Sequence, residues 1–259
     1  MDYNYHAHTF RCHHASGKPE EYVKRAISCG VKYMGFSDHV PFVCADGSES
    51  TYRVHTSEAK AYCDEIKALA QKYSDKIELK VGYEMEYYPD NFKEMLKFAS
   101  ESGAEYFILG QHFLRDESFG AEHTILETDS LEKLKIYVLR VVEGIKSGVY
   151  SYVAHPDIFN YKKDINIYRN EMRKICIASK ECNIPLEINF LGIRDSRNYP
   201  NEDFFKLAGE EKSPVTFGFD AHDVESAYDG ESLKKAEEIV KKYKLNYIGK
   251  PNIISIANK

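Results

Sequence analysis

The chain has 259 residues, of which 43% are hydrophobic and 29% charged, with a formal net charge of −6, so we expect one soluble domain over residues 1–259. No apolar run approaches the roughly 18 residues that span a bilayer, and the start MDYNYHAH lacks the parts of a secretory signal, which predicts a cytoplasmic protein with no membrane role. An acidic balance without a basic stripe argues against a nucleic acid partner and favours a small-molecule substrate.

Taken in chain order, the sequence alternates between strand patterns and helix patterns. Seven strands are expected, at residues 2–8, 33–39, 78–87, 106–113, 151–157, 185–190 and 214–223. Between them, apolar residues recur three and four apart, and the clearest helices are expected at 19–29, 59–73 and 131–145. Regular alternation predicts an α/β fold with a parallel sheet, and seven repeats over this length favour a closed barrel over an open sheet.

Metal-binding residue types gather where these strands end. Six of the seven expected strands end in such residues, which are His6, His8, Asp38, His39, Glu84, Glu86, His112, His155, Asp157, Asp220 and His222. The carboxyl ends of barrel strands meet around one opening, so these residues would face a single cavity. His6 and His8 alternate along a strand and point to the same side, as do Asp220 and His222. An inward-facing Glu84 needs a cation beside it, so the pattern predicts a metal centre.

Other residues near these motifs have simpler interpretations. We expect His13, His55 and His123 to be surface or loop residues. Cys12 lies among histidines, and packing beside the site is the expectation, with ligation as a thiolate as the alternative.

The motifs, taken together and in this order, resemble the PHP (polymerase and histidinol phosphatase) superfamily, and within it the monofunctional histidinol-phosphatase branch. The resemblance covers nearly the whole chain through HAHTFRCHHASG, GFSDHVPF, GYEMEYYP, GQHFL, YVAHPD, LEINFLGIR and FGFDAHD. It implies a distorted (β/α)7 TIM-like barrel with the active site at the C-terminal ends of the strands.

The same resemblance implies three divalent metal ions, with Zn, Mn and Fe all open as identities. The implied ligands are His6, His8, Glu84 and Asp220 for the first ion, Glu84, His112 and His155 for the second, and His14, His39 and His222 for the third. His14 is implied rather than His13 because the family places its third histidine six positions after the HxH pair. The residues expected to orient the imidazoles are Asp38, Glu86, Asp157 and Asn189.

The implied activity is hydrolysis of L-histidinol phosphate by a hydroxide that bridges two metal ions, with Glu84, Asp220 and His222 as catalytic residues. Arg194 matches the phosphate-binding arginine of the family, and Arg197 is a second candidate for substrate binding. Further candidates are Arg53 and Arg115 for phosphate, and Phe113, Asp116, Glu117 and Tyr199 for the organic group.

Three alternatives stay open. The first is a PHP phosphoesterase acting on another small phosphate ester or a nucleotide. The second is a metal-dependent amidohydrolase, which also begins with HxH but expects a bridging lysine where this chain has Glu84. The third is a non-catalytic metal-binding module, such as the PHP domains attached to polymerases.

Overall fold

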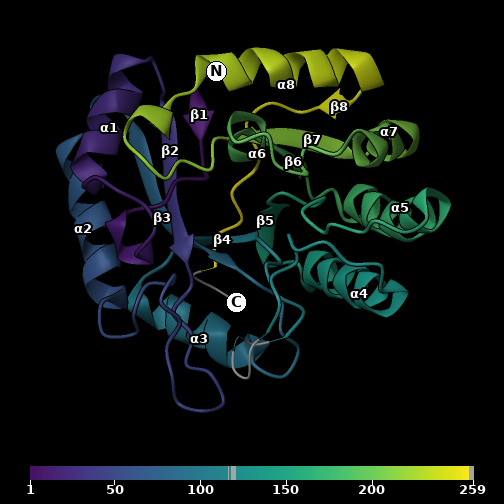
Figure 1. Ribbon diagram of the computed structural model, residues 1–259. Helices are drawn as coiled ribbons and strands as arrows, with labels where there is room; N and C mark the ends of the chain where they lie inside the picture. The colour runs from purple at the N-terminus through teal and green to yellow at the C-terminus, as the bar shows by residue number, and fades with distance from the viewer. Residues whose placement is uncertain (116, 118–120, 257–259) are drawn as a thin grey trace.

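The computed structural model describes residues 1–115, 117 and 121–256. Its parallel strands form one sheet that follows chain order, and helices surround the strands on the outside (Figure 1). The strands are β1 Tyr3–Asn4, β2 Tyr33–His39, β3 Glu78–Met85, β4 Tyr106–Leu109, β5 Tyr150–Val153, β6 Leu186–Asn189, β7 Pro214–Gly218 and β8 Asn246–Tyr247. All seven expected strands are present.

Helices alternate with the strands as the apolar spacing predicts. They are α1 Pro19–Ser28, α2 Ala59–Lys72, α3 Phe92–Ser102, α4 Leu131–Ser147, α5 Ile165–Cys182, α6 Phe190–Arg194, α7 Glu202–Glu211 and α8 Gly230–Tyr243, with short 3₁₀ turns η1 Phe10–Cys12 and η2 Glu225–Ala227. In α4, the Ser130 hydroxyl caps the first turn by accepting from the Lys133 N–H, and left-handed Gly148 ends the helix. Among the described residues, none of the helices is long and apolar enough to cross a bilayer.

The barrel closes at the carboxyl ends of its first and seventh strand segments. The backbone N–H of His8 donates to the Ala221 carbonyl at 2.8 Å, and the N–H of Ala221 donates to the His6 carbonyl at 3.2 Å. The two segments are more than 200 positions apart in the chain, and this backbone pairing brings them together. As a result the His6–His8 pair lies beside Asp220 and His222.

Near its amino end, the barrel contains an eighth strand that the sequence analysis did not predict. β8 pairs with the first two residues of β7, and the Tyr3 hydroxyl lies 3.1 Å from Thr216 Oγ1 and 3.0 Å from the Tyr247 hydroxyl. A two-residue exposed strand carries no hydrophobic period, so sequence patterning could not reveal it.

The interior below the carboxyl rim is filled with aromatic side chains. Tyr3, Tyr5, Tyr106 and Tyr152 form a buried cluster there, and the Tyr106 hydroxyl donates to the Tyr5 carbonyl at 2.9 Å. Side chains therefore fill the barrel interior at this level, and the candidate metal ligands lie above them, at the carboxyl ends of the strands.

Candidate metal centre

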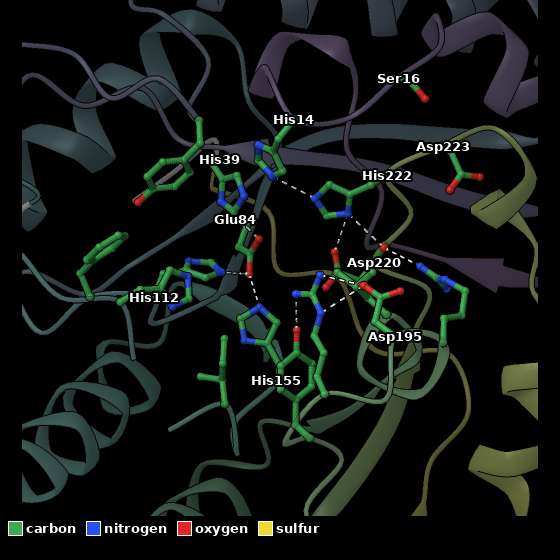
Figure 2. Close-up of a pocket in the computed structure, with 18 residues that line it drawn as sticks. His14, Ser16, His39, Glu84, His112, His155, Asp195, Asp220, His222 and Asp223 are labelled. Atoms are coloured by element: carbon green, nitrogen blue, oxygen red, sulfur yellow. Dashed lines mark hydrogen bonds and ion pairs between the residues drawn. The ribbon is translucent and has the colours of Figure 1, made fainter. Parts of the chain in front are cut away.

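A cavity of about 650 Å³ opens at the carboxyl ends of the strands (Figure 2). Seven of the nine expected ligands line it, namely His14, His39, Glu84, His112, His155, Asp220 and His222. The other two, His6 and His8, are fully buried against Glu84 and Asp220. The structure therefore brings all nine residues together at one rim.

Four ligand atoms enclose a first candidate metal position. His6 Nε2 lies 3.4 Å from Glu84 Oε2 and 3.5 Å from Asp220 Oδ1, and His8 Nε2 lies 3.5 Å and 3.4 Å from the same two oxygens. Neither nitrogen has a hydrogen-bond partner among the described residues. Ligands held about 2.0–2.1 Å from a tetrahedral ion lie about 3.3 Å from one another. The spacing and the orphaned nitrogens both fit a divalent cation.

The second carboxylate oxygen of Glu84 faces two further imidazoles. This Oε1 atom lies 2.8 Å from His155 Nε2 and 3.4 Å from His112 Nε2, and both imidazoles point at the carboxylate (Figure 2). One carboxylate thus contacts His6 and His8 through Oε2 and two further imidazoles through Oε1. This is the arrangement required of a carboxylate that bridges two ions.

A third group contains only imidazoles. The ligand atoms of His14, His39 and His222 lie within 4.8 Å of one another, and the Nε2 atoms of His14 and His222 are 3.0 Å apart. His39 Nδ1 also lies 3.4 Å from Glu84 Oε2, and His39 forms a group with Glu84 and His112. His39 therefore stands between the second and third candidate positions.

Cys12 lies close to this third group. Its sulfur is within 4.8 Å of ligand atoms of His8 and His222, but its thiol donates to the Thr9 carbonyl at 3.1 Å. Burial raises the pKa of the Cys12 thiol, with a smaller contribution from Asp38. A thiol that keeps its proton and already has an acceptor favours packing over ligation.

The protonation states of four rim residues, Glu84, Asp220, His8 and His14, suit cation binding. Burial would raise the pKa of Glu84 and Asp220, but the surrounding imidazoles hold both values well below the ordinary range. Burial, assisted by the charge of His222, lowers the pKa of His8 to about 3 and that of His14 to about 4. Burial would lower the pKa of His6 and His112 as well, but the neighbouring carboxylates raise both values, so a bound cation would displace a proton from each ring. Anionic carboxylates and neutral imidazoles are the forms in which these side chains ligate metals.

Glu187 is a functional residue that the sequence analysis missed. His6 Nδ1 donates to its Oε1 at 2.8 Å, and its Oε2 accepts from the His155 backbone N–H at 3.0 Å and from Asn189 Nδ2 at 2.8 Å. Asn189 also donates to Asp220 Oδ2 at 3.0 Å. Glu187 therefore orients residues of two candidate metal positions. The sequence feature that could have revealed Glu187 is its position: it is a carboxylate in an otherwise apolar strand, two residues before Asn189, and Glu84 occurs in the same context.

Two glycines make room for the two buried carboxylates. A Cβ atom built on Gly110 would overlap Glu84 Oε1, and one built on Gly218 would overlap Glu187 Oε1. Both glycines lie at strand ends next to the strand that carries the carboxylate. The backbone must therefore lack a side chain there for each carboxylate to face the centre.

Gly110→Ala is expected to weaken metal binding about tenfold or more, because the added methyl group displaces the Glu84 carboxylate. Titration of the metal-free protein with Zn²⁺ against a chelator measures this. Gly230→Ala is the matched control, since a Cβ there meets only Tyr228 at 3.6 Å. Equal affinity in the two variants would contradict the packing described.

Of the residues that we expected to orient imidazoles, Glu86 and Asp38 lie beside a histidine and Asp157 does not. Glu86 Oε1 accepts from His112 Nδ1 at 2.9 Å, and Asp38 Oδ1 lies 3.7 Å from His8 Nδ1 while it accepts from the Thr9 N–H at 2.7 Å. Asp157 was predicted wrongly. It accepts from the backbone N–H of Asn201 instead of an imidazole, because the chain turns at His155, where φ is 29°.

Arg53 does not face the substrate cavity, which corrects its assignment as a phosphate candidate. It is 1% exposed, and its guanidinium binds Glu86 Oε2 at 2.8 Å and Glu117 Oε1 at 2.7 Å through Nε. Burial would raise the pKa of Glu86, but Arg53 and His112 hold it below its ordinary value. Arg53 thus fixes the carboxylate that orients His112. Glu117, a candidate for binding the organic group, is instead paired with Arg53. Asp116, another such candidate, lies outside the described residues.

Arg53→Met is expected to lower the free energy of unfolding by about 3–5 kcal/mol, because Glu86 and Glu117 lose the cation between them. Urea denaturation measures the loss. Arg140→Met provides the control, since its pair with Glu143 lies on the surface and contributes about 1 kcal/mol or less. A similar, small loss in both variants would contradict the buried role.

Arg194 lines the cavity and holds the backbone at Asp220. Its guanidinium donates to the Phe219 and Asp220 carbonyls, both at 2.9 Å, and to Asp229 Oδ2 at 3.2 Å. Asp220 has a φ of 47°, a left-handed conformation that costs energy in residues other than glycine. The three contacts hold the chain in that conformation.

Arg197 is the second arginine of the cavity wall. It donates to Asp195 Oδ2 at 2.9 Å and to the Tyr199 hydroxyl at 3.1 Å, and it is exposed. Tyr199 and Phe113 also line the cavity, whereas Arg115 is exposed and is not among the lining residues described.

The three histidines assigned to surfaces or loops all lie outside the named helices and strands, as expected. His13 is exposed, and its ring lies 4.7 Å from that of His55, apart from the described lining of the cavity. His123 is a loop residue, as expected, but it also lines the cavity, which the sequence analysis did not predict. The loop that carries it pairs with the segment after β4 through a single bridge to Phe113, which no periodicity in the sequence reveals.

An α/β barrel that gathers imidazoles around a shared carboxylate at its carboxyl rim belongs to the class of barrel proteins with a candidate metal centre. The model of the PHP domain matches residues 4–190, which is more than half of the chain. The chain belongs to the PHP domain family, and the resemblance seen in the sequence is confirmed.

Among curated proteins, the chain is 25% identical over 225 residues to a probable histidinol-phosphatase of Deinococcus radiodurans, covering 84% of this chain and 85% of that one. It is 24% identical to the histidinol-phosphatase of Lactococcus lactis, covering 93% of this chain and 90% of the relative.

Two solved structures share the fold. One is the histidinol phosphate phosphatase of Lactococcus lactis complexed with zinc, L-histidinol and phosphate, with a TM-score of 0.73 and 21% identity over 99% of this chain and 97% of that one. The other is the putative histidinol phosphatase of Listeria monocytogenes, with a TM-score of 0.69 and 20% identity over 89% of this chain and 99% of that one. The comparison confirms the predicted distorted TIM-like barrel.

Proposed function

We propose that the chain is a metal-dependent phosphomonoesterase that hydrolyses L-histidinol phosphate to L-histidinol and phosphate. The observation that carries the proposal is the group formed by His6, His8, Glu84 and Asp220, whose ligand atoms surround a cation-sized space while Glu84 reaches a second group. The substrate assignment is supported by relatives named histidinol-phosphatase, which align over most of both chains.

The close approach of His6, His8 and Asp220 to Glu84 Oε2 or to one another, of His112 and His155 to Glu84 Oε1, and of His14, His39 and His222 to one another supports a proposal of three divalent ions, held by the nine residues in the sets that the family resemblance implies. When bound, such ions supply a hydroxide nucleophile at neutral pH and positive charge for the phosphate oxygens. The protein's own part is to present the ligands. Glu187 and Glu86 accept the Nδ1 protons of His6 and His112, which leaves each Nε2 lone pair directed at the centre.

The two arginines of the cavity wall are proposed to bind the phosphate group. Arg194 and Arg197 lie in the same cavity as the metal ligands, and a guanidinium matches two phosphate oxygens with its two N–H groups. Arg194 already donates to two backbone carbonyls, so Arg197, which pairs with Asp195 and Tyr199, is the more available of the two.

The remaining wall suits a small planar organic group. The rings of Tyr52 and Phe113 stack with centroids 5.8 Å apart, and Ile158 and Leu191 also line the cavity. Aromatic faces bind planar rings such as imidazole through offset or edge contacts. This wall favours an ester of a heteroaromatic alcohol as substrate.

Phosphate release from a panel of esters tests the proposal. The purified protein is loaded with Mn²⁺ or Zn²⁺ and assayed with L-histidinol phosphate, a nucleoside monophosphate, a sugar phosphate and a phosphodiester. We expect the highest kcat/KM for L-histidinol phosphate. Turnover of another monoester alone would overturn the substrate and keep the class, and absence of any hydrolysis by metal-loaded protein would overturn the enzyme.

A further inference from the structure

His123 lines the cavity but belongs to none of the three ligand groups. The centroid of its ring lies 5.5 Å from that of His112, and 5.1 Å from that of Phe113. It therefore stands between a candidate metal ligand and the aromatic wall that we assign to the organic group. Nothing in the proposed metal site accounts for a histidine at this place.

The backbone holds His123 firmly against the rim. An antiparallel bridge pairs His123 with Phe113, and the next residue, Thr124, donates its N–H to the His112 carbonyl at 2.8 Å. The Thr124 carbonyl accepts from the Asn160 N–H at 3.1 Å. The position of the imidazole relative to His112 is thus set by backbone contacts on both sides.

One hydrogen bond also sets which ring nitrogen carries the proton. The backbone N–H of Ile125 donates to His123 Nδ1 at 3.1 Å, so Nδ1 is the acceptor and has no proton of its own. The ring proton is then on Nε2. His123 is a neutral imidazole with a hydrogen-bond donor on the side away from its own loop.

The composition of the cavity wall shows what this donor would meet. Arg194, Asp195 and Arg197 carry the charge of one part of the wall, and the stacked Tyr52 and Phe113 form the apolar part. A phosphate ester with its phosphate at the metal ligands and its organic group on the aromatic rings places its bridging oxygen between the two. The His123 ring lies beside a candidate metal ligand, His112, and beside Phe113 of the apolar part.

We propose that His123 donates a hydrogen bond from Nε2–H to the leaving oxygen of the ester; this inference rests on the proposed function. As the hydroxide oxygen forms its bond to phosphorus, the bond from phosphorus to the ester oxygen breaks, and its electron pair passes to that oxygen. His123 keeps its proton and stabilises the developing alkoxide, which takes a proton from water. Removal of one such donor typically lowers kcat by about 10²-fold.

Two substitutions separate the two ring nitrogens. His123→Asn places an amide near the Nδ1 position, so it retains an acceptor for the Ile125 N–H but loses the distal donor. His123→Gln places an amide N–H near the Nε2 position and loses the proximal acceptor. We expect H123N to lower kcat for L-histidinol phosphate by about 10²-fold with KM, metal content and melting temperature unchanged, and H123Q to retain most of the activity.

The leaving group provides the second arm of the test. An aryl phosphate such as p-nitrophenyl phosphate releases a weakly basic phenoxide that needs little stabilisation, so we expect H123N to hydrolyse it as fast as the unsubstituted protein does. Equal losses on both esters, full activity of H123N on L-histidinol phosphate, or a larger loss in H123Q than in H123N would each overturn the proposal.

A third readout does not depend on activity. Nitrogen-15 NMR of the metal-free protein, with the His123 signals assigned by their loss in H123N, is expected to show the Nε2–H tautomer; a proton on Nδ1 would overturn the proposal. Failure of the proposed function can be distinguished from failure of the role of His123. An unsubstituted protein that hydrolyses no ester overturns both statements, whereas normal hydrolysis with an unaffected H123N overturns only the role of His123.

Discussion

Glu84→Gln is expected to abolish bound metal and phosphate release together, with activity falling by about 1,000-fold or more. The amide keeps the shape of the side chain but removes the negative charge and one of the two ligating oxygens. Because Oε2 faces His6 and His8 while Oε1 faces His155, the substitution affects two candidate metal positions at once. Elemental analysis and a phosphate-release assay on the same sample measure the effect.

The control lies on the same strand. Glu78→Gln, at the exposed start of β3, makes the same chemical change away from the rim and is expected to keep full metal content and activity. A Glu84→Gln variant that retained its metal and more than a tenth of its activity would show that Glu84 does not bridge two ions.

Glu187→Gln is expected to weaken metal binding about 10–100-fold and to lower activity to a similar degree. Glu187 accepts hydrogen bonds from His6 Nδ1, the His155 N–H and Asn189 Nδ2, and a glutamine has only one oxygen to offer these three donors. One donor must then face the amide NH₂ group, so the imidazole of His6 or the backbone at His155 shifts.

Competition between the metal-free protein and a chelator for Zn²⁺ measures this affinity. Glu181→Gln, an exposed position at the end of α5, is the control and is expected to leave the affinity unchanged. An affinity for Glu187→Gln equal to that of the control would mean that the hydrogen bonds around Glu187 do not position the ligands.

The repeating features of the fold could be predicted because they have a period. The apolar spacing along α2 and α4 and the buried strands β2 and β3 follow the helix and strand periods closely. The ligand-bearing ends of β2 and β3 could be found for the same reason, since a polar residue at the end of an apolar strand breaks the pattern.

Features set by single tertiary contacts could not be predicted in this way. β8 depends on two residues paired with β7, and the place of His123 depends on one bridge across a loop. Arg53 looks like any rim arginine in the sequence, and only the structure shows its burial between two carboxylates. In each case the partner lies outside the element itself, and no local period encodes the contact.

At Asp157, a local change in the backbone makes the prediction from strand alternation wrong. Strand alternation predicts that His155 and Asp157 point to the same side, yet the left-handed φ of 29° at His155 turns the chain and directs Asp157 toward Asn201. The same kind of turn at Asp220 ends β7 earlier than expected. Both turns fall at the rim, where function tolerates a strained backbone.

Metal content and phosphate release from L-histidinol phosphate, determined on one preparation before and after chelation, test the central claim most directly. The account predicts about three divalent ions per chain, loss of hydrolysis when they are removed, and recovery when Zn²⁺ or Mn²⁺ is restored. Hydrolysis that persists in fully metal-free protein, or folded protein that binds no divalent ion, would contradict it.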